Sequence, residues 1–193
     1  MKGIFDMGNR VVVFCPAYTH SGGPELLHQL CYGLRNHGIN AMMYYYEYSA
    51  ERGNPVPSCY EGYKNPYVTD YEESESDSVV IPETKPIYLK TIQKAKKFFW
   101  WLSVDNYYVA TARSFGRRLG FTRKQAYFFK EKIHLIDYTR YLLKNDVIHL
   151  VQSEYAKQNA LGLGVPESRI HMLSDYINPV FIDNARRNMK RYK

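Results

Sequence analysis

The sequence has little that would place the protein across a membrane, outside the cell or around a metal ion. No apolar run approaches the roughly 18 residues of a membrane-spanning helix, and residues 1–10 lack the apolar region of a signal peptide. The three cysteines, Cys15, Cys31 and Cys59, are far apart and form neither a Cys-x-x-Cys pair nor a zinc-binding spacing. These absences favour a protein of the reducing cytosol with no metal site.

Familiar nucleotide-binding and catalytic motifs are absent as well. The adjacent glycines Gly22 and Gly23 belong neither to a Walker loop, since no Gly-Lys-Ser/Thr follows, nor to a G-x-G-x-x-G turn. Glu47 follows the second predicted strand, where a dinucleotide site keeps its ribose-binding acid, but one acid does not define such a site. No Ser-His-Asp set or pair of catalytic carboxylates stands out. We therefore expect no bound cofactor.

What the sequence does have is positive charge and aromatic side chains. The 193 residues carry a net charge of +7 and include 19 Tyr, 9 Phe and 2 Trp. Hydrophobic residues make up 45% and charged residues 23%, which is the composition of a globular protein rather than a disordered one. The charge indicates an anionic partner: nucleic acid, a phosphate-bearing small molecule or a membrane surface.

Short apolar runs alternate with helical patterns along the chain. Helices are predicted from Pro24, where apolar residues recur at helical spacing until Gly38, and over 84–94 and 154–163. Ser153 is expected to cap the last of these helices, and 104–106 reads as a polar turn. Strands are predicted at 11–15, 39–46, 79–81, 97–103, 147–152 and 169–174.

This alternation predicts an α/β fold, a Rossmann-like doubly wound parallel sheet in a single domain. The domain spans 1–183, with 47–78 as a solvated acidic surface excursion and 184–193 as a basic linker or tail. Ligands of such sheets bind beyond the carboxyl ends of the strands. The informative loops are therefore those that follow Cys15, Ile81, Ser103, Gln152 and Ser174.

The order and spacing of several segments resemble a known family. Residues 11–46, with their strand, Gly-Gly loop and leucine-bearing helix, resemble the N-terminal half of a GT-B glycosyltransferase of the family 4 type. Residues 149–181 are similar to the last unit of the same N-domain, with its Ser-capped helix and Gly-Val-Pro turn. The segments VVIPE (79–83) and FFWWLSVDNYY (98–108) look like a bacterial subset that makes surface polysaccharides.

The resemblance implies the acceptor-side domain of a transferase that uses a nucleotide-sugar donor and a glycan or lipid-linked acceptor. In that family the donor sits mainly in a C-terminal GT-B domain, whose Glu-containing motif has no counterpart here. We expect that domain to be supplied in cis or in trans, and the isolated chain to be inactive. The expected location is cytoplasmic, peripheral on the inner face of the plasma membrane.

Site residues follow from the positions that match the family. Gly22 and Gly23 match the loop that faces the donor diphosphate, and an α-helix that starts there would point its amides at the phosphates. Asp105 and Asn106 match the polar catalytic position near the acceptor hydroxyl, although an Asx turn explains them equally.

Three further residues are acceptor-binding candidates, each with a structural alternative. His20 is otherwise an exposed loop histidine, Glu83 a solvated surface acid and Ser153 a helix cap. His149 and His171, which lie in predicted strands, are interpreted as structural histidines.

The most basic stretch is 113–132, with seven basic residues against one acid, a net charge of +6. One interpretation is a solvated helix that packs its aromatic face on the sheet. The other is a membrane-facing surface for an anionic bilayer, since cations and aromatic side chains both favour that interface. Its proposed membrane-facing residues are Arg117, Arg118, Arg123 and Lys124.

Two other functions remain open from the sequence. The chain is alternatively a non-catalytic Rossmann-like binding subunit of a split transferase. The charge and aromatic content also suggest a nucleic-acid-binding protein, but no recognisable DNA- or RNA-binding motif is present, and we expect no nucleic-acid partner.

Overall fold

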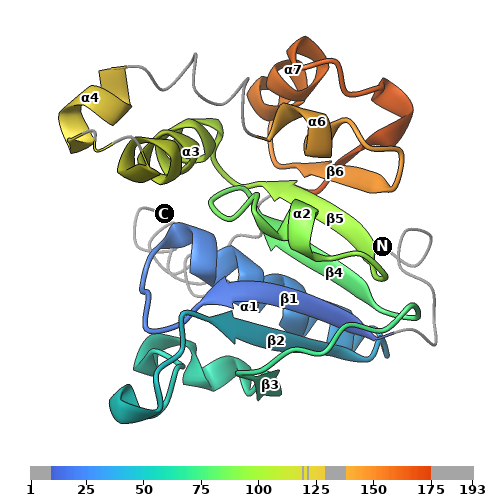
Figure 1. The fold of residues 1–193 in the computed structure, drawn as a ribbon. Helices are drawn as coiled ribbons and strands as arrows, with labels where there is room; N and C mark the ends of the chain where they lie inside the picture. Colours follow the sequence, from blue (N-terminus) through green and yellow to red (C-terminus); the bar gives the residue numbers. More distant parts are fainter. Residues whose placement is uncertain (1–9, 119, 121, 129–137, 175–193) are drawn as a thin grey trace, which may run out of the picture.

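The computed structural model describes residues 10–118, 120, 122–128 and 138–174. They form one seven-stranded sheet, parallel throughout, with helices on both faces (Figure 1). This confirms the predicted α/β Rossmann-like fold. The strands are β1 (Val11–Pro16), β2 (Ala41–Tyr46), β3 (Tyr67–Val68), β4 (Ser78–Pro82), β5 (Lys96–Trp101), β6 (Val147–Val151) and β7 (Ile170–Met172).

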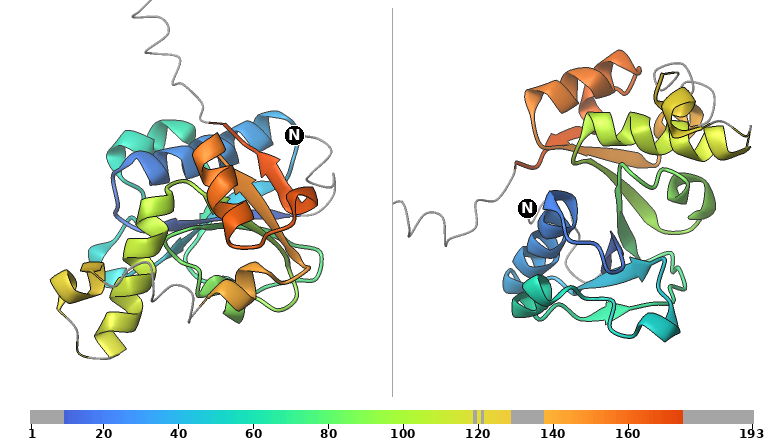
Figure 2. Two further views of the ribbon diagram at one scale, coloured as in Figure 1. Left: turned by 90° about the horizontal axis from the view of Figure 1, so that it is seen from above. Right: turned by 90° about the vertical axis from the view of Figure 1, so that its left-hand side faces the viewer.

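The helices cover the sheet in two layers. α1 packs on one face with Val13, Tyr45 and Trp100, whereas residues of α2, α3 and α7 join Phe14, Phe99 and Trp101 in the core of the other face. Figure 2, seen from above, shows α1 and α3 on opposite sides of the strands. The described helices are α1 (Gly22–Asn36), α2 (Tyr88–Thr91), α3 (Val104–Arg118), α4 (Arg123–Phe128), α6 (Thr139–Leu142) and α7 (Glu154–Gly162).

Strand order determines where a ligand can enter. The order β3-β2-β1-β4-β5-β6-β7 means that the chain winds from β1 toward β3 and then returns to the other side of β1 as β4. The loops after β1 and β4 therefore leave the sheet in opposite directions. In doubly wound sheets a crevice for ligands forms at this switch point, beyond the carboxyl ends of the two strands.

Local sequence explains α1 and its ends. Its leucines and Cys31 recur at helical spacing and are buried against β1 and β2. The helix begins at Gly22, two residues before Pro24, and ends at Asn36. Gly38 follows with φ of +77°, a left-handed conformation that favours glycine and stops the helix.

Two predicted elements differ in the structure. Helix 84–94 is reduced to the four residues of α2, because Pro86 and the loop around it precede it. The expected polar turn 104–106 is the first turn of α3, which follows β5 almost directly. The short helix α4 lies within the basic stretch 113–132. The predicted tail 184–193 lies outside the described residues.

The excursion 47–78 contains more structure than a solvated acidic loop. It holds the 3-10 turns η1 (Ala50–Arg52) and η2 (Ser58–Tyr63) and the edge strand β3. Tyr60 of η2 is only 2% exposed, and Asp77, the last acid of the acidic run, is 3% exposed. Tyr60 and Asp77, which were predicted to lie in a solvated loop, are therefore packed into the domain.

Asp77 holds together the amino ends of the central strands. Both of its carboxylate oxygens accept hydrogen bonds from Arg10, at 2.9 and 2.6 Å, and one oxygen also accepts from the Tyr71 hydroxyl and the Ser74 amide. Burial alone would raise the pKa of Asp77, but these donors outweigh burial and lower it. The carboxylate is therefore a buried charge with a full set of partners.

We expect Asp77→Asn to lower the free energy of unfolding by about 1–3 kcal/mol, because the charge-assisted bonds to Arg10 are lost while that cation stays in place. Urea unfolding at pH 7 measures the change. Asp70→Asn, at an exposed acid of the same segment, is the matched control and should change little. Equal stabilities of the two variants would contradict this role.

Candidate functional site

The candidate site lies at the carboxyl edge of β1, β4, β5 and β6. The segments that leave these strands carry most of the predicted site residues: His20, Gly22 and Gly23 after β1, Glu83 after β4, Asp105 and Asn106 after β5, and Ser153 after β6. Parallel strands bring their carboxyl ends to the same edge, so the fold gathers these segments. Among the described residues, no group of His, Cys, Asp and Glu side chains is arranged to hold a metal ion.

The Gly-Gly turn opens α1 at this edge. Ser21 and Gly22 are exposed, and the Ser21 side chain makes no capping bond to the helix. Instead, Tyr60 from η2 fixes the backbone of Ser21: its hydroxyl accepts from the Ser21 amide at 3.1 Å and donates to the Ser21 carbonyl at 2.9 Å. The ring of exposed His20 stands edge-on to Tyr60, with centroids 5.8 Å apart. The backbone of the turn is therefore fixed by Tyr60, a residue of the excursion 47–78, and not by a helix cap.

The fold itself does not require glycine at Gly22 or Gly23. Neither residue has a positive φ. A Cβ on Gly22 would meet no atom within 4 Å, and one on Gly23 would make only ordinary contact with Leu102 Cδ1 at 3.8 Å. Glycine at these positions therefore leaves the start of a 15-residue helix without side chains, a feature of anion-binding turns.

Glu83 is buried, so its interpretation as a solvated acid is wrong. The residue is 2% exposed, and its carboxylate accepts a hydrogen bond from the Leu102 amide at 3.3 Å. Burial raises the pKa of Glu83 to about 8, with hydrogen bonds acting in the opposite direction. The carboxyl is therefore mostly protonated at neutral pH. In this position it joins the end of β4 to the end of β5.

The backbone of Leu102 also joins β5 to β6. The Leu102 carbonyl accepts a hydrogen bond from the Gln152 side-chain amide, which follows β6. The Gln152 side-chain oxygen and the Trp100 indole nitrogen are buried near this edge and have no hydrogen-bond partner among the described residues. Glu83, Leu102 and Gln152 thus form a polar scaffold across three strand ends, and sequence reasoning did not identify Gln152.

Asp105 and Asn106 occupy the first turn of α3, not an Asx turn. Both are exposed. The Asn106 amide donates to the Ser103 hydroxyl at 3.3 Å, so Ser103 supports the start of the helix. The two side chains therefore project from a helix end at the ligand edge of the sheet.

Ser153 is a helix cap, as its structural alternative predicted. Its hydroxyl accepts from the Ala156 amide at 3.2 Å, at the start of α7. The Ser153 hydroxyl is used to cap α7. Its geometry therefore does not support a role in acceptor binding.

His149 has the structural role predicted for it. It is fully buried, its Nδ1 accepts from the Trp101 indole at 3.0 Å, and its Nε2 lies 3.0 Å from the Leu142 carbonyl. Burial lowers its pKa to about 4, so the ring is neutral. His171 is partly exposed on β7.

His28 is a buried histidine that sequence reasoning missed. Its ring nitrogens lie 2.7 Å from the Pro24 carbonyl and 2.7 Å from the Tyr45 hydroxyl, and its ring packs on Tyr60. Burial lowers its pKa. Its position between Leu27 and Cys31 on the apolar face of α1 was the available signal.

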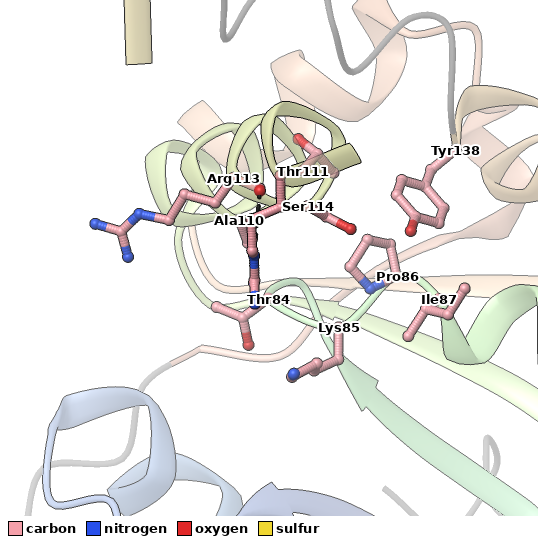
Figure 3. Close-up of a pocket in the computed structure, with 10 residues that line it drawn as sticks. Thr84, Lys85, Pro86, Ile87, Ala110, Thr111, Arg113, Ser114 and Tyr138 are labelled. Carbon is pink, nitrogen blue, oxygen red and sulfur yellow. Dashed lines mark hydrogen bonds between the residues drawn. The ribbon is translucent and has the colours of Figure 1, made fainter. Parts of the chain in front are cut away.

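A cleft of about 300 Å³ opens between the loop after β4 and the helix α3 (Figure 3). Of the four residues predicted to face a membrane, Arg117 lines this cleft. Arg118 ends α3, Arg123 begins α4, and Lys124 is exposed on α4. Sequence reasoning missed the cleft itself, which is lined by Thr84, Lys85, Pro86, Ile87, Ala110, Thr111, Arg113, Ser114, Arg117 and Tyr138.

Together these observations define a doubly wound, Rossmann-like α/β domain with a cleft lined by three basic side chains, Lys85, Arg113 and Arg117. Comparison with protein-family models, curated proteins and solved structures found no match for the chain. No described helix has the length and apolar character needed to cross a bilayer.

The buried carboxyl of Glu83 makes stability depend on pH in a defined direction. Its folded pKa of about 8 lies above the unfolded value of about 4.3. Its contribution is therefore fully present below about pH 4 and is lost as pH rises through 8. We expect Glu83→Gln to be more stable than the wild type at pH 9, by on the order of 2–4 kcal/mol, and close to it at pH 5.

Urea unfolding at pH 5, 7 and 9 measures this difference. Glu75→Gln, at an exposed acid, is the control and should follow the wild type at every pH. If Glu83→Gln and the wild type show the same pH profile, Glu83 is not a protonated buried acid.

Proposed function

We propose that this chain is the acceptor-side domain of a GT-B-type glycosyltransferase that acts in polysaccharide or glycan biosynthesis. The observation that carries the proposal is the open amide turn at Gly22 and Gly23, placed beside the switch point of a doubly wound sheet. A Rossmann-like α/β fold is what the proposal requires of such a domain, and the segments that resemble the family supply the strand ends around the turn.

The donor diphosphate would be stabilised by the turn. The N-terminal end of α1 carries partial positive charge, and Gly22 at its start is exposed, which favours an anion there. Such preorganised donors stabilise the charge that develops on a leaving diphosphate. A second domain, in cis or in trans, holds the rest of the nucleotide sugar in this proposal.

The acceptor would lie along the neighbouring strand ends. Asp105 and Asn106 are exposed on the first turn of α3 and are suited to orient an acceptor hydroxyl. Glu83 acts behind them as a positioning residue, because its buried carboxyl contacts the Leu102 backbone. The leaving diphosphate assists removal of the acceptor proton, so orientation and phosphate stabilisation provide most of the rate enhancement.

The first test is sugar transfer from a panel of nucleotide sugars. We expect the enzyme that combines this chain with its donor domain to transfer sugar, and residues 1–193 alone to transfer none. Radiolabelled product formation is the readout. Steady turnover by the isolated chain would contradict the assignment to an acceptor-side domain.

Gly23→Leu tests the turn itself. The added side chain would fill space between the turn and Leu102, where the donor diphosphate would approach in this proposal, and we expect transfer to fall by about 10²–10³-fold. The domain should stay folded, because leucine favours a helix more than glycine does. Gly162→Leu, at a glycine in the last turn of α7 where a Cβ would meet no atom within 4 Å, is the matched control. Normal transfer by Gly23→Leu would show that the turn does not face the donor.

We also infer a peripheral position on the inner face of the plasma membrane, near a lipid-linked acceptor. The supporting observations are the basic sequence of 113–132 and the exposure of Lys124 on α4. Each basic residue near an anionic leaflet contributes about 1 kcal/mol, and the attraction fades within a Debye length.

Vesicle cosedimentation tests this position. We expect binding to phosphatidylserine vesicles that falls with salt, and at least tenfold weaker binding for Arg123→Glu/Lys124→Glu. This variant leaves Arg117 and the cleft intact. Lys94→Glu/Lys96→Glu, at exposed residues beside the amino end of β5, is the control for net charge. Equal losses in both variants would contradict a specific membrane face.

A further inference from the structure

The cleft between the β4–α2 loop and α3 concentrates positive charge. Lys85, Arg113 and Arg117 line it, and none of the lining residues that the structure describes is acidic. Lys85 forms an ion pair with exposed Glu47, which lies outside the lining. Arg113 and Arg117 are both exposed. Two cations at this spacing on a helix repel each other and cost a few tenths of a kcal/mol, a cost that an anion between them would remove.

The helix presents the two arginines together. They are one helical turn apart on α3, and the Arg117 side chain contacts the Arg113 carbonyl. Guanidinium groups bind phosphate oxygens through two parallel hydrogen bonds, so a pair of them is suited to a phosphate group.

The other end of the cleft is apolar. In Figure 3 the Arg113 guanidinium extends to one side, whereas Pro86, Ile87 and Tyr138 lie at the opposite side. Pro86 and Tyr138 are buried, so they form a fixed wall. A volume of about 300 Å³ is at the lower limit of small-molecule sites and suits a phosphate with a small organic group.

We propose that this cleft binds a phosphate ester, with Arg113 and Arg117 on the phosphate and the apolar wall on the group that it carries. Thr84 follows Glu83 directly, so the cleft adjoins the strand end at which the acceptor would lie. Its assignment to the acceptor rests on the proposed function: the acceptor is then a phosphate-bearing molecule, either a lipid phosphate or a sugar phosphate.

Isothermal titration of the whole chain tests the proposal. The probes are geranyl phosphate and glucose 1-phosphate, and geraniol and glucose are the uncharged controls, at constant ionic strength. We expect at least one ester to bind, and its alcohol to bind at least tenfold more weakly. Preference for geranyl phosphate identifies a lipid source, and preference for glucose 1-phosphate identifies a sugar source.

Charge-removing variants locate the binding. We expect Arg113→Gln/Arg117→Gln to weaken ester binding at least tenfold, and Lys94→Gln/Lys96→Gln, which removes the same charge at the amino edge of the sheet, to bind as the wild type does. Arg113→Lys keeps the charge and loses the guanidinium fork, and it should give an intermediate loss. It also provides the test if the double variant does not fold.

Three results would overturn the proposal: no binding of either ester, equal losses in the two double variants, or unchanged binding in both Arg113→Gln/Arg117→Gln and Arg113→Lys. The titration contains no nucleotide sugar. A failed titration therefore refutes the cleft as a phosphate site but does not bear on sugar transfer from the donor. A failed transfer test, in turn, does not affect the result of the titration.

Discussion

The pairing of β1 with β2 on one side and with β4 on the other determines where this protein can bind a ligand. All three strands run in the same direction, and Val11 to Cys15 are almost completely buried. An apolar β-branched strand of this kind is stable only between two neighbours and two helix layers. Because the chain leaves β1 in one direction and β4 in the other, the segments after them diverge, and the start of α1, with Gly22 exposed, lies at the sheet edge.

Buried polar groups keep that edge rigid. Glu83 and Gln152 bond to the backbone N–H and C=O of the same residue, Leu102, from the strands on either side of β5, and Tyr60 fixes the turn before α1. A polar group buried without a partner is costly, so each of these contacts resists movement of the loop that bears it. The exposed cations Arg113 and Arg117 then line a cleft beside this framework.

Much of the fold was predictable because it depends on local patterns. The apolar runs predicted the six longer strands, and the spacing of the leucines predicted α1. The two-residue strand β3 was missed because it pairs only at the sheet edge with β2. The start of α3 was missed because Asp105 and Asn106 favour turns, whereas here Ser103 caps a helix.

The site was less predictable than the fold. Glu83 follows a proline and looks like a surface acid, and its burial depends on Leu102, which is distant in sequence. The cleft joins the β4–α2 loop to the second half of α3, and no local pattern connects these segments. Tyr60 likewise contacts Ser21 from far along the chain. Local sequence patterns do not predict contacts between side chains that only the tertiary fold brings together.

The central claim is that the carboxyl edge around β1 and β4 is where this protein binds phosphate groups. The most direct measurement is NMR mapping of amide shifts in residues 1–193 titrated with pyrophosphate at constant ionic strength. We expect the saturable shifts to fall in 21–25, 84–87 and 113–117. Shifts centred on Lys94 and Lys96 beside the amino edge, or none that saturate, would contradict the account.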